Sequence, residues 1–318
     1  ILQLALHTAI HRIGEVGKSP VDDTYYMCSE NGSYQYSDWR KATEFEYDTY
    51  GETCTVTDVG KRINGMVFAT NNYYCSADGW VRITADWSWN VPKEARLNPE
   101  ITYGTLTDSR DGKKYKTVKI GDQTWMAENL NYSDSVRTPF LSGHSWCYDN
   151  ESEKCDVTGR LYTWWAAVDS ISFNDSGYSI NCDLSDCYYD NGSHKDCFVQ
   201  CSLPSKYRGI CPSGWHLPNN DEWNTLIAAV GDTPSAGVIL KSQTGWKNNG
   251  SDDVGFSALP GGSYTSSFGA QSVGNGCSFW SFAVNFNWGY GNRFPYAFSL
   301  SVPNVIFDGW NAGFSVRC

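Results

Sequence analysis

This chain of 318 residues is poor in charged residues, and the charges it carries are mostly acidic. Lys, Arg, Asp and Glu make up 19% of the sequence, and the net charge is −11 at pH 7. A nucleic-acid-binding surface needs clusters of Lys and Arg against the phosphates, so we expect no nucleic-acid partner. The same balance argues against an anionic membrane surface. No run of 18 apolar residues occurs, so we expect no membrane span.

Several catalytic and metal-binding patterns are also missing. The sequence has no G-x-S-x-G motif, no H-E-x-x-H motif and no P-loop. Its twelve cysteines lack the paired C-x-x-C spacing of a zinc ribbon. Asp183, Asp186 and Asp190 match no calcium-loop spacing. We therefore expect that the protein is not an enzyme, with no catalytic residues, no metal site and no cofactor.

Cysteine, glycine and aromatic residues are what the sequence has in abundance. Trp, Tyr and Phe reach 15% of the chain, and 30 residues are Gly. Such a composition with little Lys or Glu is typical of β-structure with long loops. The even number of cysteines indicates disulfide bonds and a location outside the reducing cytosol. Cys147 and Cys155 bracket a polar loop, and we expect them to close it as a disulfide.

Residues 1–20 differ from the rest in composition. Leu2, Leu4, Leu6 and Ile10 alternate with polar or small residues, which is the period-2 pattern of a strand with one buried face. A helical face fits nearly as well, so the pattern leaves strand or helix open. Its apolar side must be covered, either by the same domain or by a neighbouring copy of the chain that accepts it as a donated strand.

Residues 21–91 contain a degenerate repeat of two β-hairpins. In each copy an aromatic strand leads into an Asn-Gly or Asp-Gly turn and then into a strand that carries Trp. Cys28, Cys54 and Cys75 lie in this region, and because three is odd, we expect one of them to pair elsewhere. Residues 92–107 are interpreted as a linker.

Residues 108–318 carry the pattern of an α+β domain. Strands at Tyr115–Ile120 and Gln123–Met126 flank the turn Gly121-Asp122, and a short amphipathic helix is expected over Leu161–Val168. Residues 171–208 are a polar insertion with four cysteines. Short aromatic strands separated by Gly, Asn and Pro follow later in the chain. Helices early and strands late favour the α+β class.

The stretch GICPSGWHLPNNDEW at Gly209–Trp223 organises this domain. Asn219 is placed as a helix N-cap, with Glu222 in the capping-box position. Trp223, Leu226, Ile227 and Val230 then form one apolar helix face, which ends at Gly231. We interpret Asp221 and Glu222 as capping residues rather than an acid/base pair. His216 is interpreted as a hydrogen-bonded structural histidine.

Five motifs resemble the Fibrobacter succinogenes major paralogous domain family. They are GKKYKTVKIGDQTWMAENLNY, GRLYTWWAA, GICPSGWHLPNNDEWNTL, GFSALPGG and GFSVRC, and they cover about residues 108–318. The resemblance implies a C-type-lectin-like or formylglycine-generating-enzyme-like fold, here preceded by a small β-hairpin repeat module. GFSVRC would be the closing strand, so Cys211 is expected to bridge Cys318. The resemblance also implies a secreted or surface protein and brings no established activity.

Aromatic side chains crowd the Gly- and Asn-rich region near the C-terminus. Trp288, Tyr290 and Trp310 are our candidates for ligand contact, because pyranose rings stack their C–H faces on Trp and Tyr. The alternative is that such side chains pack in the core.

The sequence therefore predicts a non-catalytic secreted protein of the bacterial cell surface with a structural and adhesive function. In this hypothesis it is a subunit of a surface filament or layer, assembles with copies of itself through the N-terminal segment, and displays a lectin-like domain. The alternative is a monomeric adhesin that binds plant polysaccharide through exposed aromatic residues.

Overall fold

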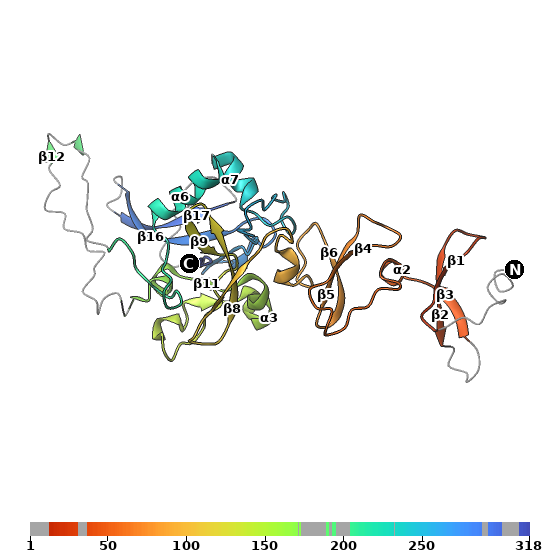
Figure 1. The fold of residues 1–318 in the computed structure, drawn as a ribbon. Coiled ribbons are helices and arrows are strands. Elements are labelled where there is room, and N and C mark those ends of the chain that lie inside the picture. Colours follow the sequence, from red (N-terminus) through yellow and green to blue (C-terminus); the bar gives the residue numbers. More distant parts are fainter. Residues whose placement is uncertain are drawn as a thin grey trace. The chain divides into compact units, whose positions relative to one another are not determined.

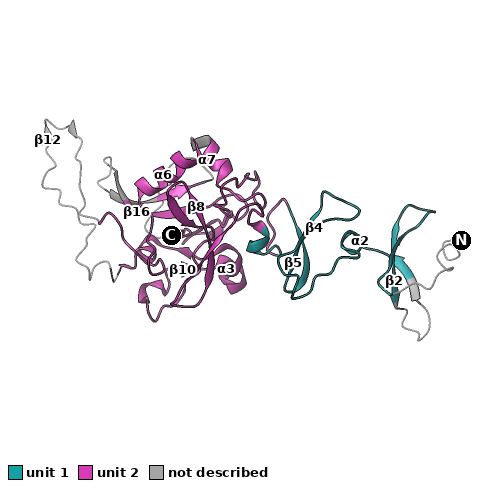
Figure 2. Ribbon diagram, viewed as in Figure 1, with its two compact units in different colours: residues 1–84, 90–95 teal, residues 85–89, 96–318 magenta. Residues whose placement is uncertain are grey.

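The computed structural model describes residues 13–30, 37–170, 172, 189–190, 193–194, 204–231, 233–287, 292–300 and 312–318. The chain divides into two compact units (Figure 2). Unit 1 comprises residues 1–84 and 90–95, and unit 2 comprises residues 85–89 and 96–318. The expected linker at 92–107 contains regular structure, namely the 3-10 helix η1 (Lys93–Arg96) and strand β7 (Gly104–Thr107).

Unit 1 contains two antiparallel sheets of three strands each (Figure 1). The elements are β1 (Val16–Lys18), β2 (Tyr25–Glu30), β3 (Ser37–Lys41), α2 (Glu44–Asp48), β4 (Arg62–Asn64), β5 (Asn72–Ser76) and β6 (Gly79–Ile83). The two predicted hairpins correspond to β2–β3 and β5–β6. Each sheet also has a preceding three-residue strand, β1 or β4, which the sequence pattern did not reveal.

The two sheets are structural repeats of each other. The amide of Gly14 donates to the Cys28 carbonyl at 2.8 Å, and the amide of Gly60 donates to the Cys75 carbonyl at 2.9 Å. Both glycines have positive φ values, 87° and 98°, which glycine adopts without a steric penalty. Cys28 and Cys75 therefore occupy equivalent positions. Cys75 forms a disulfide with Cys54, whereas Cys28 is a buried free thiol.

The helix between the repeats supplies a buried carboxylate to the second sheet. Asp48, at the end of α2, has no exposed surface. Its side chain accepts hydrogen bonds from the amides of Val67 and Phe68 at 3.0 and 2.9 Å and from Asn71 and Tyr73. Burial opposes ionisation of Asp48, but these hydrogen bonds hold its pKa below the ordinary value. The loop before β5 is thus built around a residue of the connecting helix.

Unit 2 has an α+β fold that consists mostly of small sheets. Its elements after β7 are β8 (Lys114–Ile120), β9 (Gln123–Met126), η2 (Pro139–Leu141), β10 (Ser145–Trp146), η3 (Tyr148–Asn150), α3 (Ser152–Thr158), β11 (Leu161–Tyr162), α4 (Trp164–Ala167), β12 (Tyr189–Asp190), β13 (Ser193–His194), α6 (Asn220–Val230), α7 (Thr233–Ile239), β14 (Ser263–Thr265), β15 (Gly269–Gln271), β16 (Ser278–Asn287) and β17 (Asn292–Ser299). The strand pairs that the structure describes in unit 2 are antiparallel, and isolated parallel bridges also occur, one of them between Phe279 and Ser315.

The β7–β8–β9 sheet contributes to two hydrophobic clusters. Successive strand residues point to opposite faces. Met126 belongs to one cluster with Trp164 and Trp280, and Trp125 belongs to the other with Trp223. The rings of Trp125 and Trp223 lie 4.8 Å apart, so the sheet packs directly on helix α6.

The local sequence signals match α6 closely and α4 only in part. Asn219 caps α6, and its capping box with Glu222 is complete. Trp223, Leu226 and Val230 are buried, as the apolar face predicted. The helix expected over Leu161–Val168 begins only at Trp164, because Leu161 pairs with Trp146 in the β10–β11 ladder.

Candidate functional site

Three of the sequence motifs meet at the side chain of Arg317, which has no exposed surface. Its Nε donates to the Asn129 side chain at 2.8 Å, and its Nη2 donates to the Ser257 carbonyl at 3.1 Å. Nη1 donates to the carbonyls of Phe256 and Met126. The guanidinium also stacks on the Phe256 ring at 4.4 Å. Arg317 therefore joins the GFSVRC motif to the backbone of GFSALPGG and to the Met126–Asn129 segment. Its role is structural.

Asp252 lies in the same region and is also fully buried. It accepts hydrogen bonds from the amide of Ser257 at 2.7 Å and from its hydroxyl at 2.6 Å. The Ser257 hydroxyl also contacts Tyr103 at 2.9 Å. Burial raises the pKa of Asp252 to about 7, even though Ser257 and Arg317 favour its ionised form.

The raised pKa of Asp252 predicts a pH dependence of stability. Folded protein keeps this proton up to about pH 7, whereas the unfolded chain loses it near pH 4. Stability should therefore fall as the pH rises from about 4 to about 7, by up to about 4 kcal/mol. Asp252→Asn should flatten this part of the profile, because the amide side chain does not titrate. Asn also tolerates the positive φ of 53° found there, so the variant should fold. Urea unfolding of both proteins between pH 4 and pH 8 measures this, and parallel profiles would contradict it.

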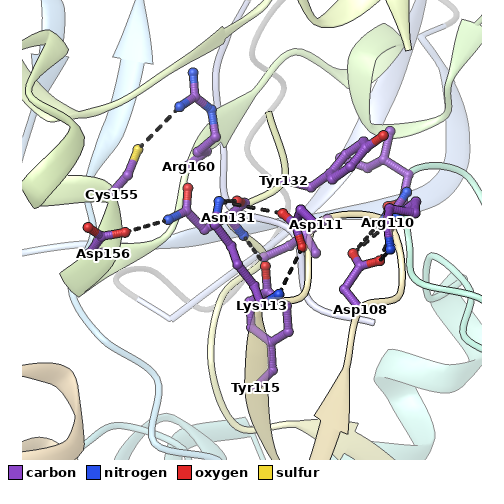
Figure 3. A network of polar contacts seen from close by, with 12 residues as sticks. Asp108, Arg110, Asp111, Lys113, Tyr115, Asn131, Tyr132, Cys155, Asp156 and Arg160 are labelled. Atoms are coloured by element: carbon purple, nitrogen blue, oxygen red, sulfur yellow. Dashed lines mark hydrogen bonds and ion pairs between the residues drawn. The ribbon is translucent and has the colours of Figure 1, made fainter. Parts of the chain in front are cut away.

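A second polar network surrounds Asp108, Arg110 and Asn131 (Figure 3). Arg110 donates to the buried Asp108 carboxylate at 2.9 and 2.7 Å, and its guanidinium lies 3.7 Å from the centre of the Tyr132 ring. The same Arg110 donates to the carbonyl of Ile210 at 2.8 Å. Nearby, Asn131 donates to Asp156 at 3.0 Å. These contacts stabilise the fold of unit 2.

Some of the motifs also line an open cavity of about 290 Å³ beside His216. We call it the His216 pocket. It is formed by the β8–β9 turn, the loop before α6, the first turn of α6 and the C-terminal cysteine. Its lining residues are Asp122, Gln123, Thr124, Trp125, Lys206, Gly214, Trp215, His216, Pro218, Glu222 and Cys318.

His216 is held in this pocket by Glu222, with Nε2 and Oε1 2.7 Å apart. The second carboxylate oxygen of Glu222 accepts the Asn219 amide at 3.0 Å. Burial opposes ionisation of Glu222, but His216 and Asn219 hold its pKa below the ordinary value. One carboxylate therefore completes the helix cap and orients the imidazole. The Gln123 side chain fixes the other wall by donating to the Glu222 carbonyl at 3.1 Å.

Comparison with known protein families identifies the family of this chain. The profile of the Fibrobacter succinogenes major domain matches residues 118–318, which is more than half of the chain. The chain belongs to this family. No curated protein and no solved structure matches it.

Both disulfides that the sequence analysis expected are present in the structure. Cys147 is bonded to Cys155, and Cys211 is bonded to Cys318. Together with Cys54–Cys75, they fit a secreted or extracellular protein. Among the described residues, no helix is long and apolar enough to cross a membrane. Within the same part of the chain, no group of three or more His, Cys, Asp or Glu is arranged to hold a metal ion.

The remaining predicted site residues are the candidates for ligand contact and for assembly. Trp288, Tyr290 and Trp310 lie outside the described residues, as do Leu2, Leu4, Leu6 and Ile10. Sequence reasoning noted His216 but did not recognise the pocket. Its walls come from segments about 90 residues apart in the chain. The available signal was the Trp215-His216 pair after the Gly214 turn, where both side chains are only partly buried.

Proposed function

We propose that this chain is a non-catalytic adhesive protein of the bacterial cell surface, with unit 2 as its C-type-lectin-like binding domain. The observation that carries the proposal is the His216 pocket. Family motifs elsewhere in unit 2 are committed to buried contacts such as those of Arg317. At the pocket they instead leave Trp215 and His216 only partly buried, at the edge of a cavity.

The contacts of Glu222 argue against its acting as a general base. A general base needs a group free to accept a substrate proton. Both oxygens of Glu222 accept hydrogen bonds from the protein, one at His216 and one at the helix cap. His216 is therefore a positioned hydrogen-bonding group beside a tryptophan, which suits recognition of a polar ligand.

An adhesion assay tests this function without assuming a ligand. Beads coated with the full chain should bind insoluble plant cell-wall particles or bacterial cells at least several-fold better than beads coated with the heat-denatured chain. Equal retention of both would contradict an adhesive function. Sustained turnover of a polysaccharide, detected as new reducing ends, would contradict a non-catalytic one.

Assembly through the N-terminal segment is the structural part of the same proposal. The support is the apolar alternation of Leu2, Leu4, Leu6 and Ile10, which needs a cover. We expect the full chain to form filaments or large oligomers and the chain without residues 1–14 to stay monomeric. Electron microscopy and light scattering measure this. A monomeric full chain would contradict assembly. The alternative hypothesis, in which the protein is a monomeric adhesin, would then remain.

A further inference from the structure

We propose that the His216 pocket binds a short segment of an uncharged polysaccharide, with one sugar ring packed on Trp215. The inference rests on the proposed adhesive function and names its ligand. It also takes Trp215, in the loop before α6, as the aromatic contact in place of Trp288, Tyr290 and Trp310.

The dimensions and rim of the pocket suit part of a polymer. Its volume of about 290 Å³ lies at the lower end of the range for small-molecule pockets. Asp122, Thr124 and Lys206, which line it, are exposed residues. A ligand held there is therefore not enclosed, and a chain of sugar rings can continue beyond the cavity.

The lining combines an aromatic side chain with hydrogen-bonding groups, as sugar recognition requires. Trp215 is partly buried against the core and also lines the pocket, and its amide donates to the Pro212 carbonyl at 3.0 Å, so a closed turn fixes its backbone. The apolar C–H face of a pyranose can cover such a ring, while its hydroxyls need donors and acceptors around the edge. Lys206 supplies a donor and Asp122 an acceptor.

His216 adds a directed polar group. Nε2 is the ring nitrogen that hydrogen-bonds to Glu222, so Nδ1 is the one that can contact a ligand hydroxyl. The helix cap fixes Glu222 and so holds the imidazole in place before a ligand arrives. Such preorganisation lowers the entropic cost of binding.

The charges of the pocket favour an uncharged ligand. One cation, Lys206, lies among the same lining residues as the carboxylates of Asp122 and Glu222. The whole chain carries a net charge of −11, which repels polyanions at a distance. An acidic polymer such as a polyuronate would be repelled by the carboxylates of the pocket and by the net charge of the chain. A neutral glucan or xylan would not be repelled by either.

Affinity electrophoresis and calorimetry with soluble neutral glucan, xylan and polygalacturonate test the inference. We expect the wild-type chain to bind a neutral polymer at least tenfold more tightly than polygalacturonate. Trp215→Ala should weaken that binding at least tenfold, since aromatic anchors dominate binding energy. Trp215→Phe keeps an aromatic face and should stay within about threefold of wild type.

The matched control is Phe268→Ala, which removes an aromatic side chain that is 79% exposed in the β14–β15 turn, outside the pocket. It should bind as wild type does, and thermal melts of every variant establish that each is folded. Unchanged binding by folded Trp215→Ala would overturn the site and leave the adhesive function intact. Preference for polygalacturonate, or no binding to any of these polymers, would overturn the ligand class. The bead assay then decides independently whether the chain is adhesive.

Discussion

Replacing Arg317 with methionine should cost unit 2 at least about 3 kcal/mol of stability, because it removes four buried hydrogen-bond contacts at once. The carbonyls of Met126, Phe256 and Ser257 and the side chain of Asn129 would lose their donor. All four of these residues are buried. Differential scanning calorimetry of the full chain should show the unit 2 transition moving down by several degrees, with the unit 1 transition unchanged.

Arg137→Met provides the comparison, because the Arg137 side chain is 62% exposed and meets Asp134 at 3.5 Å. Exposed ion pairs contribute less than about 1 kcal/mol, so this variant should melt close to wild type. If the Arg317 and Arg137 variants melted at the same temperature, the role assigned to Arg317 would be wrong.

The second large effect concerns the Cys211–Cys318 disulfide. It closes a loop of 107 residues, and Cys147–Cys155 closes one of 8. In the chain-entropy model a crosslink stabilises by restricting the unfolded state, more so for longer loops. Replacing both Cys211 and Cys318 with serine should therefore cost about 5 kcal/mol, and replacing both Cys147 and Cys155 about 2.5 kcal/mol.

Urea unfolding of the two double variants measures this difference directly. Each variant removes two sulfur atoms and one crosslink, and all four cysteines are buried, so the chemical change is matched. Equal losses of stability would show that restriction of the unfolded state is not the main contribution of the 211–318 bond.

The elements that the sequence predicted correctly are those specified by local interactions. Asn219 and Glu222 are three residues apart and cap α6 without help from the rest of the chain. The same holds for the hairpin of β8 and β9 around Gly121-Asp122. The pairing of Cys147 with Cys155 likewise follows from a short polar loop.

The elements that it missed are specified by distant partners. Strands β1 and β4 have three residues each, too few to show an alternating pattern, and they exist because they pair with β2 and β5. Leu161 fits a helical face, yet it pairs with Trp146 and belongs to a strand. The His216 pocket depends on the packing of Trp125 against Trp223, which no spacing in the sequence encodes.

The position of Asp48 has a consequence for where a repeat of unit 1 begins. Its carboxylate lies beneath the loop before β5, although the residue belongs to the helix that follows the first sheet. A fragment that started at residue 49 would keep all three strands of the second sheet and lose the group that organises its loop. The independent folding module therefore starts upstream of its own sheet, at Thr43, the residue that caps α2. Where such sheets follow one another in a chain, the connecting helix completes the module after it.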